Sequence, residues 1–220
     1  MPDAFKVEVS NGERVTASLY ASRAKNAPAV VLAHGAGASQ TSPFMVDMAE
    51  GLAERGIGVT TFDFVYTEKK RRAPDKPALL EACYRAVVRD VRVRKSGRAL
   101  FIGGKSMGGR IASQIASGEK GFSGLVFLGY PLHPPGKLTQ LRAKHLPGIE
   151  SPMLFVQGSR DAFGTPEELR PVLAPLDAEI FTVDGGDHSF KVPKSMGTTH
   201  DAVMAAVMDK VAVWILARAK

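Results

Sequence analysis

The chain alternates short apolar runs with amphipathic stretches, and this alternation predicts its fold. Six runs have the composition of strands buried on both faces of a sheet: Ala29–Ala33, Ile57–Phe64, Ala99–Ile102, Gly124–Leu128, Met153–Val156 and Glu179–Val183. Apolar residues at helical spacing predict helices at Phe44–Arg55, Ala78–Lys95, Met107–Ser117, Pro166–Leu173 and Thr199–Arg218. Strands and helices in alternation indicate an α/β fold with a mostly parallel, doubly wound sheet.

The N-terminal segment has a different pattern. Phe5–Val9 and Val15–Tyr20 alternate apolar and polar residues around Asn11-Gly12, a pair typical of tight turns. We therefore expect an antiparallel hairpin at one edge of the sheet. The apolar runs continue from residue 29 to residue 216 without a linker, so we interpret residues 1–220 as a single domain.

Composition narrows the class of protein. The chain has 220 residues, of which 45% are apolar, enough for one substantial core. Its single cysteine excludes an intrachain disulfide and a cysteine-based zinc cluster, and the N-terminus has no apolar signal core. The most apolar stretch, Ala202–Ala217, is interrupted by Asp209 and Lys210 and is too short to span a bilayer. We expect a cytoplasmic protein with no membrane partner.

The net charge of +7 raises the question of an acidic partner. Basic residues gather in the segment 69–76 and along the predicted helix that follows it. No aromatic residues are interleaved with them, so a solvated basic face is favoured over a nucleic-acid site. A second hypothesis is that the segment 69–76 attracts an anionic substrate or partner.

One strand-to-helix junction contains the pattern Gly-x-Ser-x-Gly. Gly104 and Gly108 lie two positions either side of Ser106, between a predicted strand and a predicted helix. Glycines at these positions let the chain turn sharply without a Cβ clash, which presents the serine Oγ above the sheet. The pentapeptide alone is common, so the strand and helix around it make Ser106 a candidate nucleophile.

A serine nucleophile needs a base to take its proton and a third group to orient that base. Asp161 and His188 each follow a later predicted strand, in the order Ser, Asp, His that one recurring arrangement requires. Asp184 and Asp187 are alternative acids. A close sequence neighbour of the histidine rarely points at its Nδ1, so Asp161 is favoured.

The loop after the first buried strand is rich in glycine. It runs from His34 through Gly35, Ala36 and Gly37 to Ser39. Backbone N–H groups in such a loop can stabilise an oxyanion, and the N–H of Met107 would be the second donor. Ala36 is the favoured first donor and Gly37 the alternative.

No motif predicts a cofactor. The loop lacks the third glycine of a dinucleotide fingerprint, and Gly104-Lys105-Ser106 lacks the upstream glycine of a phosphate-binding loop, since position 99 is alanine. No set of His and carboxylate residues has the spacing of metal ligands. We expect neither a cofactor nor a metal.

The sequence resembles the α/β-hydrolases from the hairpin to the last helix. One comparison is dienelactone hydrolase, whose nucleophile is cysteine where this chain has Ser106. A closer resemblance is to the hydrolase-like family that includes a subunit of the NSL histone-acetyltransferase complex and a testis-expressed protein. The chain departs from that family at Asp63 and Val65, where the family usually has Asn and Pro. The segments that carry the resemblance are residues 34–37, 62–66, 71–74, 105–110, 129–137 and 158–165.

The resemblance implies an α/β-hydrolase fold and, less specifically, a hydrolytic reaction. Larger hydrolases insert a helical cap between the strands at Gly124–Leu128 and Met153–Val156, and the short segment here predicts a shallow site without a cap. We expect six residues to contact the substrate, the last three at the rim: His34, Gly35, Gly37, Tyr66, His133 and Phe163.

Together these features predict a serine hydrolase that acts on a small ester or thioester, of the carboxylesterase or thioesterase type. The alternative is an inactive or weakly active scaffold that binds a partner through the basic segment 69–76. A scaffold has no need for Ser106, Asp161 and His188 at matched strand ends, which favours the enzyme.

Overall fold

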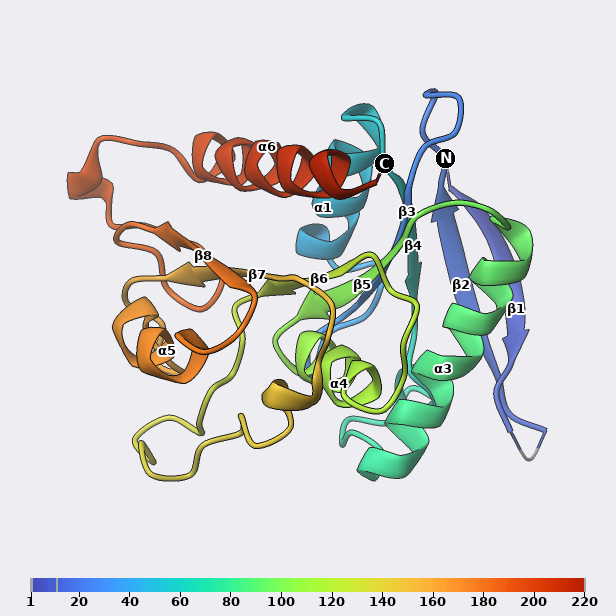
Figure 1. The fold of residues 1–220 in the computed structure, drawn as a ribbon, viewed down its shortest axis with the longest axis horizontal. Coiled ribbons are helices and arrows are strands. Elements are labelled where there is room, and N and C mark those ends of the chain that lie inside the picture. Colours follow the sequence, from blue (N-terminus) through green and yellow to red (C-terminus); the bar gives the residue numbers. More distant parts are fainter. Residues whose placement is uncertain (1, 11, 220) are drawn as a thin grey trace.

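The computed structural model describes residues 2–10 and 12–219, which fold around one eight-stranded sheet (Figure 1). The strand order is β1-β2-β4-β3-β5-β6-β7-β8. The first two strands pair antiparallel with each other and β2 pairs antiparallel with β4, whereas all later neighbours are parallel. The strands are β1 Asp3–Glu8, β2 Arg14–Tyr20, β3 Ala29–Ala33, β4 Gly58–Phe62, β5 Leu100–Lys105, β6 Gly124–Leu128, β7 Met153–Gly158 and β8 Ala178–Val183.

The predicted hairpin forms the β1 edge of this sheet. Its register runs from Asp3 opposite Leu19 to Glu8 opposite Arg14. Asn11, the first residue of the predicted turn, lies outside the described residues, and Gly12 has a φ of 76°. A positive φ suits the tight turn that the Asn-Gly pair predicted.

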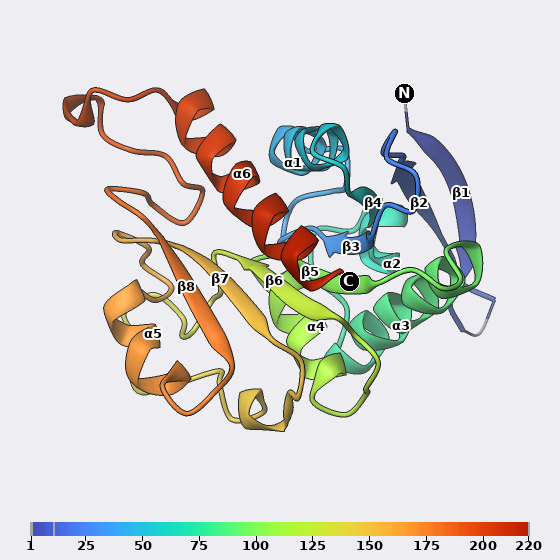
Figure 2. The same cartoon turned by 45° about the horizontal axis from the view of Figure 1, so that its top comes forward.

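Helices cover both faces of the sheet. Helices α1 and α6 lie on one face and α3, α4 and α5 on the other (Figures 1 and 2). The helices are α1 Pro43–Glu54, α2 Val65–Glu68, α3 Pro77–Arg94, α4 Met107–Ala116, α5 Pro166–Leu173 and α6 His200–Arg218, with short 3₁₀ turns at Leu146–Gly148 and Lys194–Met196. This is the doubly wound α/β arrangement that the sequence predicted.

The helix ends follow from local sequence signals. Proline occupies the first turn of α1, α3 and α5. A backbone N–H at this position has no acceptor within the helix, so proline's lack of one breaks no helical hydrogen bond. At α5, Thr165 accepts the N–H of Glu168 while the Glu168 side chain accepts the N–H of Thr165. This capping box fixes the start of α5 and thereby the loop that precedes it.

Two apolar cores lie on the two sides of the sheet. Beneath it, Phe127, Tyr130 and Phe155 pack with ring centroids 4.6 to 5.4 Å apart. Above it, Trp214 of α6 packs edge-on against Phe101 of β5. Because both of their faces are buried, β3 and β6 have no solvent-facing polar residues and consist of continuous apolar runs.

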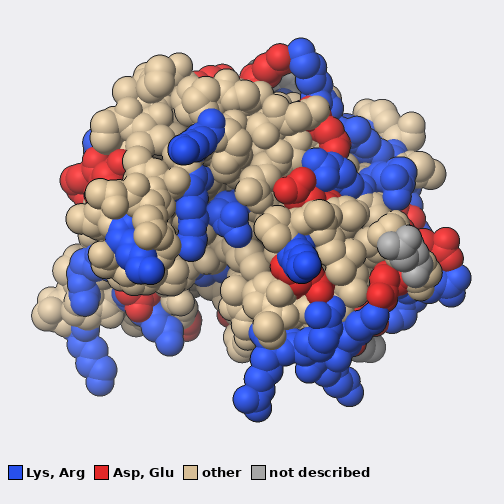
Figure 3. Space-filling model, turned by 90° about the horizontal axis from the view of Figure 1, so that it is seen from below, with Lys and Arg blue, Asp and Glu red and all other residues tan. Residues whose placement is uncertain are grey.

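The segment 129–152 between β6 and β7 contains one short 3₁₀ turn and, within the described residues, no cap domain. The face beneath the sheet, where α3, α4 and α5 lie, carries more Lys and Arg than Asp and Glu (Figure 3). Residues 69–76 contribute to the basic surface, and Lys69, Lys70, Arg71 and Arg72 are all exposed.

Candidate active site

Ser106 occupies the tight junction between β5 and α4. Its backbone has φ 50° and ψ −115°, a left-handed conformation that is costly for a residue with a Cβ atom. A Cβ added at Gly104 or at Gly108 would lie 2.3 Å from the carbonyl oxygen of Ala33 on β3. Glycine at both positions therefore allows the junction to pack against the neighbouring strand while the Ser106 side chain points outward.

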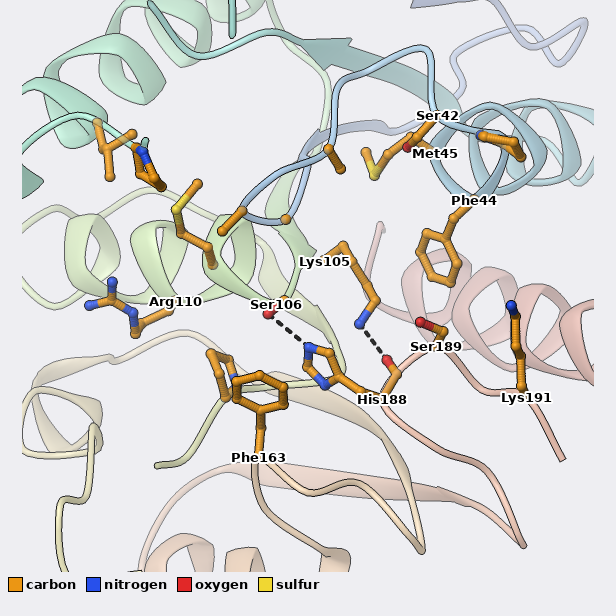
Figure 4. A pocket seen from close by; sticks show the side chains of 18 of the residues that line it. Ser42, Phe44, Met45, Lys105, Ser106, Arg110, Phe163, His188, Ser189 and Lys191 are labelled. Carbon is orange, nitrogen blue, oxygen red and sulfur yellow. Dashed lines mark hydrogen bonds between the residues drawn. The ribbon is translucent and has the colours of Figure 1, made fainter. Parts of the chain in front are cut away.

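Ser106, His188 and Asp161 form a continuous chain of hydrogen bonds. Ser106 Oγ lies 2.9 Å from Nε2 of His188 (Figure 4). Nδ1 of the same ring lies 2.7 Å from Oδ2 of Asp161. Asp161 follows β7 and His188 follows β8, so both come from the carboxyl ends of strands. With the Nδ1 proton donated to the carboxylate, Nε2 is left to accept the serine proton.

Asp161 is buried and held from two sides. Phe163 N–H donates to its Oδ1 at 2.8 Å, and Gln157 Nε2 donates to its Oδ2 at 2.9 Å. Gln157 is itself buried at the end of β7 and also bonds the backbone of Tyr130 and Gly164. The sequence analysis missed Gln157, although a polar side chain next to an apolar strand run was an available signal.

Lys105 connects the nucleophile strand to the histidine loop. Its ammonium group donates a hydrogen bond to the carbonyl oxygen of His188 and lies 5.7 Å from the ring centres of Phe44 and Phe190 (Figure 4). Burial lowers the pKa of Lys105 from 10.5 to about 8. The lysine thus holds the backbone of His188 beside Ser106.

The glycine-rich loop after β3 passes close to the nucleophile. A Cβ added at Gly35 would lie 3.5 Å from the Ser106 Cβ. The backbone N–H groups of Ala36 and of Met107, the first residue of α4, have no acceptor within the described part of the chain. Both residues line the pocket that contains Ser106, so their N–H groups are available to a ligand there.

This main pocket has a volume of about 930 Å³. Ser106, Met107, Phe163 and His188 line it together with Gly35 and Ala36, all of which the sequence analysis named as candidate site residues. The remaining lining includes apolar side chains from α1, α3 and α6, namely Phe44, Met45, Leu80 and Met204. Phe163 lies over the His188 ring with their centroids 4.3 Å apart. Gly37 lies in the same loop as Ala36 with φ 72°, but it does not line the pocket.

The structure does not place His34 or Tyr66 at the pocket. Tyr66 is only 1% exposed because it falls in the short helix α2, which follows the predicted strand Ile57–Phe64 and which the sequence analysis did not predict. His34 is fully buried beside it, where Nδ1–H donates to Gly35 O and Nε2 accepts the N–H of Phe64. Burial lowers the pKa of His34. This neutral ring fastens the glycine-rich loop to the segment after β4.

His133 also lies away from the main pocket. It is 2% exposed, and its Nε2 lies 3.4 Å from a carboxylate oxygen of Glu168 on α5. Its backbone N–H donates to Phe163 O, which turns the side chain toward α5. The structure therefore does not bring His133 to the pocket that contains Ser106, and its contact with Phe163 is made through the backbone.

The described residues contain neither a metal-binding cluster nor a membrane-spanning helix. Among residues 2–10 and 12–219, no group of three or more His, Cys, Asp or Glu side chains could hold a metal ion. No helix in the same residues is both long enough and apolar enough to cross a bilayer. Cys83 is buried on α3, and burial raises its pKa to about 12, so the thiol stays protonated.

Solved structures with the same fold come from several bacteria. Dienelactone hydrolase from Anabaena variabilis is 18% identical, covers 100% of this chain and 99% of its own, and has a TM-score of 0.81. Est1E from Butyrivibrio proteoclasticus is 14% identical over 97% of this chain and 99% of its own, with a TM-score of 0.77. An α/β serine hydrolase without a lid from Xanthomonas campestris is 17% identical over 97% and 94%, with a TM-score of 0.75.

At these identities the likeness concerns the fold. The sequence itself matches the family model described as "Alpha/beta hydrolase domain" over residues 26–216, which takes in every strand from β3 to β8 and all of the helices except the last residues of α6. The chain therefore belongs to the alpha/beta hydrolase family.

Proposed function

We propose that the protein is a serine hydrolase that cleaves a small ester or thioester through Ser106, His188 and Asp161. The hydrogen-bonded chain from Ser106 Oγ to the Asp161 carboxylate, with steps of 2.9 and 2.7 Å, is the observation that carries this proposal. Such a chain provides a nucleophile, a base and a group that orients the base, which is what acyl transfer to serine requires.

In the proposed reaction, Ser106 Oγ attacks the carbonyl carbon of the substrate while His188 Nε2 takes the hydroxyl proton. The carbonyl oxygen becomes an oxyanion that accepts hydrogen bonds from the N–H groups of Ala36 and Met107. His188 then gives its proton to the leaving oxygen or sulfur, and the carbon–heteroatom bond breaks. Water, deprotonated by His188, releases the acyl group from Ser106 by the same steps.

The shape of the main pocket supports a substrate of modest size. About 930 Å³ lies within the range of small-molecule sites, and the lining contains apolar side chains beside the nucleophile. The segment 129–152 adds no helical cap among the described residues, so the acyl group and the leaving group have an open path to Ser106.

The test combines active-site labelling with hydrolysis. A fluorophosphonate probe should label the wild type and not Ser106→Ala, and the variant should lose kcat on short 4-nitrophenyl esters and on acyl thioesters by about 10⁴-fold or more. Ser159→Ala, which removes another serine hydroxyl near a strand end, is the matched control and should remain labelled. A wild-type protein that resists the probe and cleaves none of these substrates would contradict the proposal.

A further inference from the structure

Two arginines, Arg110 and Arg142, line the main pocket. Arg110 lies one helical turn after Ser106 on α4, and its backbone N–H donates to the carbonyl oxygen of Ser106. Arg142 comes from the segment between β6 and β7. Both side chains are half-buried, and both border the same 930 Å³ space as Ser106 and His188.

The two guanidinium groups lack anionic partners. Within residues 2–10 and 12–219, neither side chain donates a hydrogen bond or forms an ion pair, unlike most other partly buried arginines of the chain. Burial, and then the like charge of Arg142, lowers the pKa of Arg110. Two neighbouring cations in a partly desolvated pocket repel each other, so an anion bound between them would be stabilised by both.

Two carboxylates around this pair already have partners: Glu81, whose charge acts on Arg110, and Asp75, which lines the pocket. Glu81 on α3 forms an ion pair with Arg85 at 3.0 Å. Asp75 accepts hydrogen bonds from Arg71 and from the backbone N–H of Tyr66. Since these groups have their own partners, the positive charge of the arginine pair remains available to a ligand in the pocket.

The backbone that carries Arg142 is held firmly. Arg142 N–H donates to Leu132 O at 2.7 Å, and Arg142 O accepts the hydroxyl of Tyr130 at 2.8 Å. Nearby, His145 is hydrogen-bonded to Ser113 on α4 at 2.7 Å, which ties this segment to the helix that carries Arg110. The backbone positions that carry the two arginines are therefore fixed relative to each other and to Ser106.

The arginines lie on the side of Ser106 that the acyl group would occupy. His188 must protonate the leaving group, so the leaving group lies beside the imidazole. In Figure 4 Arg110 and His188 extend to different sides of Ser106, with Phe44, Ser189 and Lys191 beyond the histidine. The acyl chain then points from Ser106 toward Arg110, on which the charge of Arg142 acts.

From this arrangement we propose that Arg110 and Arg142 bind a carboxylate at the far end of the acyl group, so that the substrates are monoesters or monothioesters of dicarboxylic acids. The inference rests on the proposed function, because it uses Ser106 as the point from which the acyl chain extends. Guanidinium groups suit this ligand because they present paired N–H donors to the two oxygens of a carboxylate.

The test compares matched substrates. The monoethyl esters of glutarate, adipate and suberate are assayed against ethyl esters of monocarboxylates of equal length, with ethanol release as the readout. The best dicarboxylate monoester should have a kcat/KM at least about tenfold higher than its matched ester. Arg110→Gln and Arg142→Gln should each remove most of this preference. Arg170→Gln, an exposed residue of α5 with the same loss of charge, should retain it.

A binding experiment makes the test independent of turnover. The Ser106→Ala variant is titrated calorimetrically with adipate and with hexanoate, and adipate should bind about tenfold more tightly, an advantage lost when Arg110→Gln is added. Equal binding of the two acids, or a preference that survives Arg110→Gln with Arg142→Gln, would overturn the inference. An arginine-dependent preference for a carboxylate on the leaving group instead would overturn the acyl assignment. Failure to cleave any ester, with adipate still bound through the arginines, would count against the proposed function alone.

Discussion

The two sides of the main pocket differ in how their charged groups are paired. On the triad side, Asp161, His188 and Lys105 each have a hydrogen-bond partner within 2.9 Å. On the other side, the guanidinium groups of Arg110 and Arg142 have no hydrogen-bond or ion-pair partner among the described residues. Groups that must be positioned before the substrate arrives are fixed by the fold, whereas groups without partners in the fold are available to the ligand. Under the two proposals, the residues that carry out the reaction are held by the protein itself, whereas the arginines that recognise the substrate obtain their partner only when it binds.

The largest effect is expected from a substitution of Asp161, the buried acid on the triad side of the pocket. Asp161→Asn replaces the carboxylate by an amide that no longer favours the imidazole tautomer with its proton on Nδ1, so kcat should fall by about 10⁴-fold for every ester tested. Steady-state kinetics with charged and neutral esters measure it. Asp184→Asn is the control, because Asp184 is exposed and near His188 in sequence. Equal losses in the two variants would show that Asp161 is not the acid.

A smaller effect, on stability rather than rate, is expected from Lys105. Its pKa is about 8 in the folded protein and 10.5 ordinarily, so between these pH values the unfolded chain binds more protons than the folded one. The unfolding free energy should therefore rise across this window, by up to about 3 kcal/mol from this group. Urea unfolding of the wild type and Lys105→Met should show the rise only in the wild type. Lys137→Met controls for the loss of one exposed charge.

The smallest effect is expected from the exposed basic segment 69–76. Lys70→Glu combined with Arg72→Glu changes side chains that extend into solvent, whereas Lys69 and Arg71 are paired with Glu13 and Asp75. The double variant should change kcat/KM less than twofold and stability by no more than about 0.5 kcal/mol. A loss of tenfold or more in kcat/KM would assign substrate attraction to this segment and not to the pocket arginines.

Much of the fold could be predicted because the burial of a strand or helix determines which of its positions are apolar. Both faces of β3 and β6 are covered, so these strands are apolar throughout and have the bounds that the pattern gave. The junction at Ser106 was also visible, because Gly104 and Gly108 are needed where a Cβ would collide with Ala33. These features follow from burial and from close backbone contacts, and both restrict the residue types that a single sequence shows at each position.

The misplaced residues depend on where a side chain points. Tyr66 was expected at the rim, but a helix of four residues turns it into the core, and so short a helix has no periodicity to detect. His133 is turned toward α5 by a backbone contact with Phe163, thirty positions later in the chain. Arg110 could have been noticed, since it lies four residues after Ser106 on one helix face. Arg142 lies in a segment without regular secondary structure, where the spacing of residues does not predict which side chains share a face.

The backbone of Ser106 has a consequence for how such a chain evolves. At φ 50° any residue except glycine costs of order 1–3 kcal/mol, and a glycine there would relieve that cost. A lineage that kept this fold only as a surface for partners would gain stability by a single mutation to glycine. Under the proposed function, the reaction needs the Ser106 hydroxyl, and this need opposes the replacement by glycine that backbone energy alone would favour.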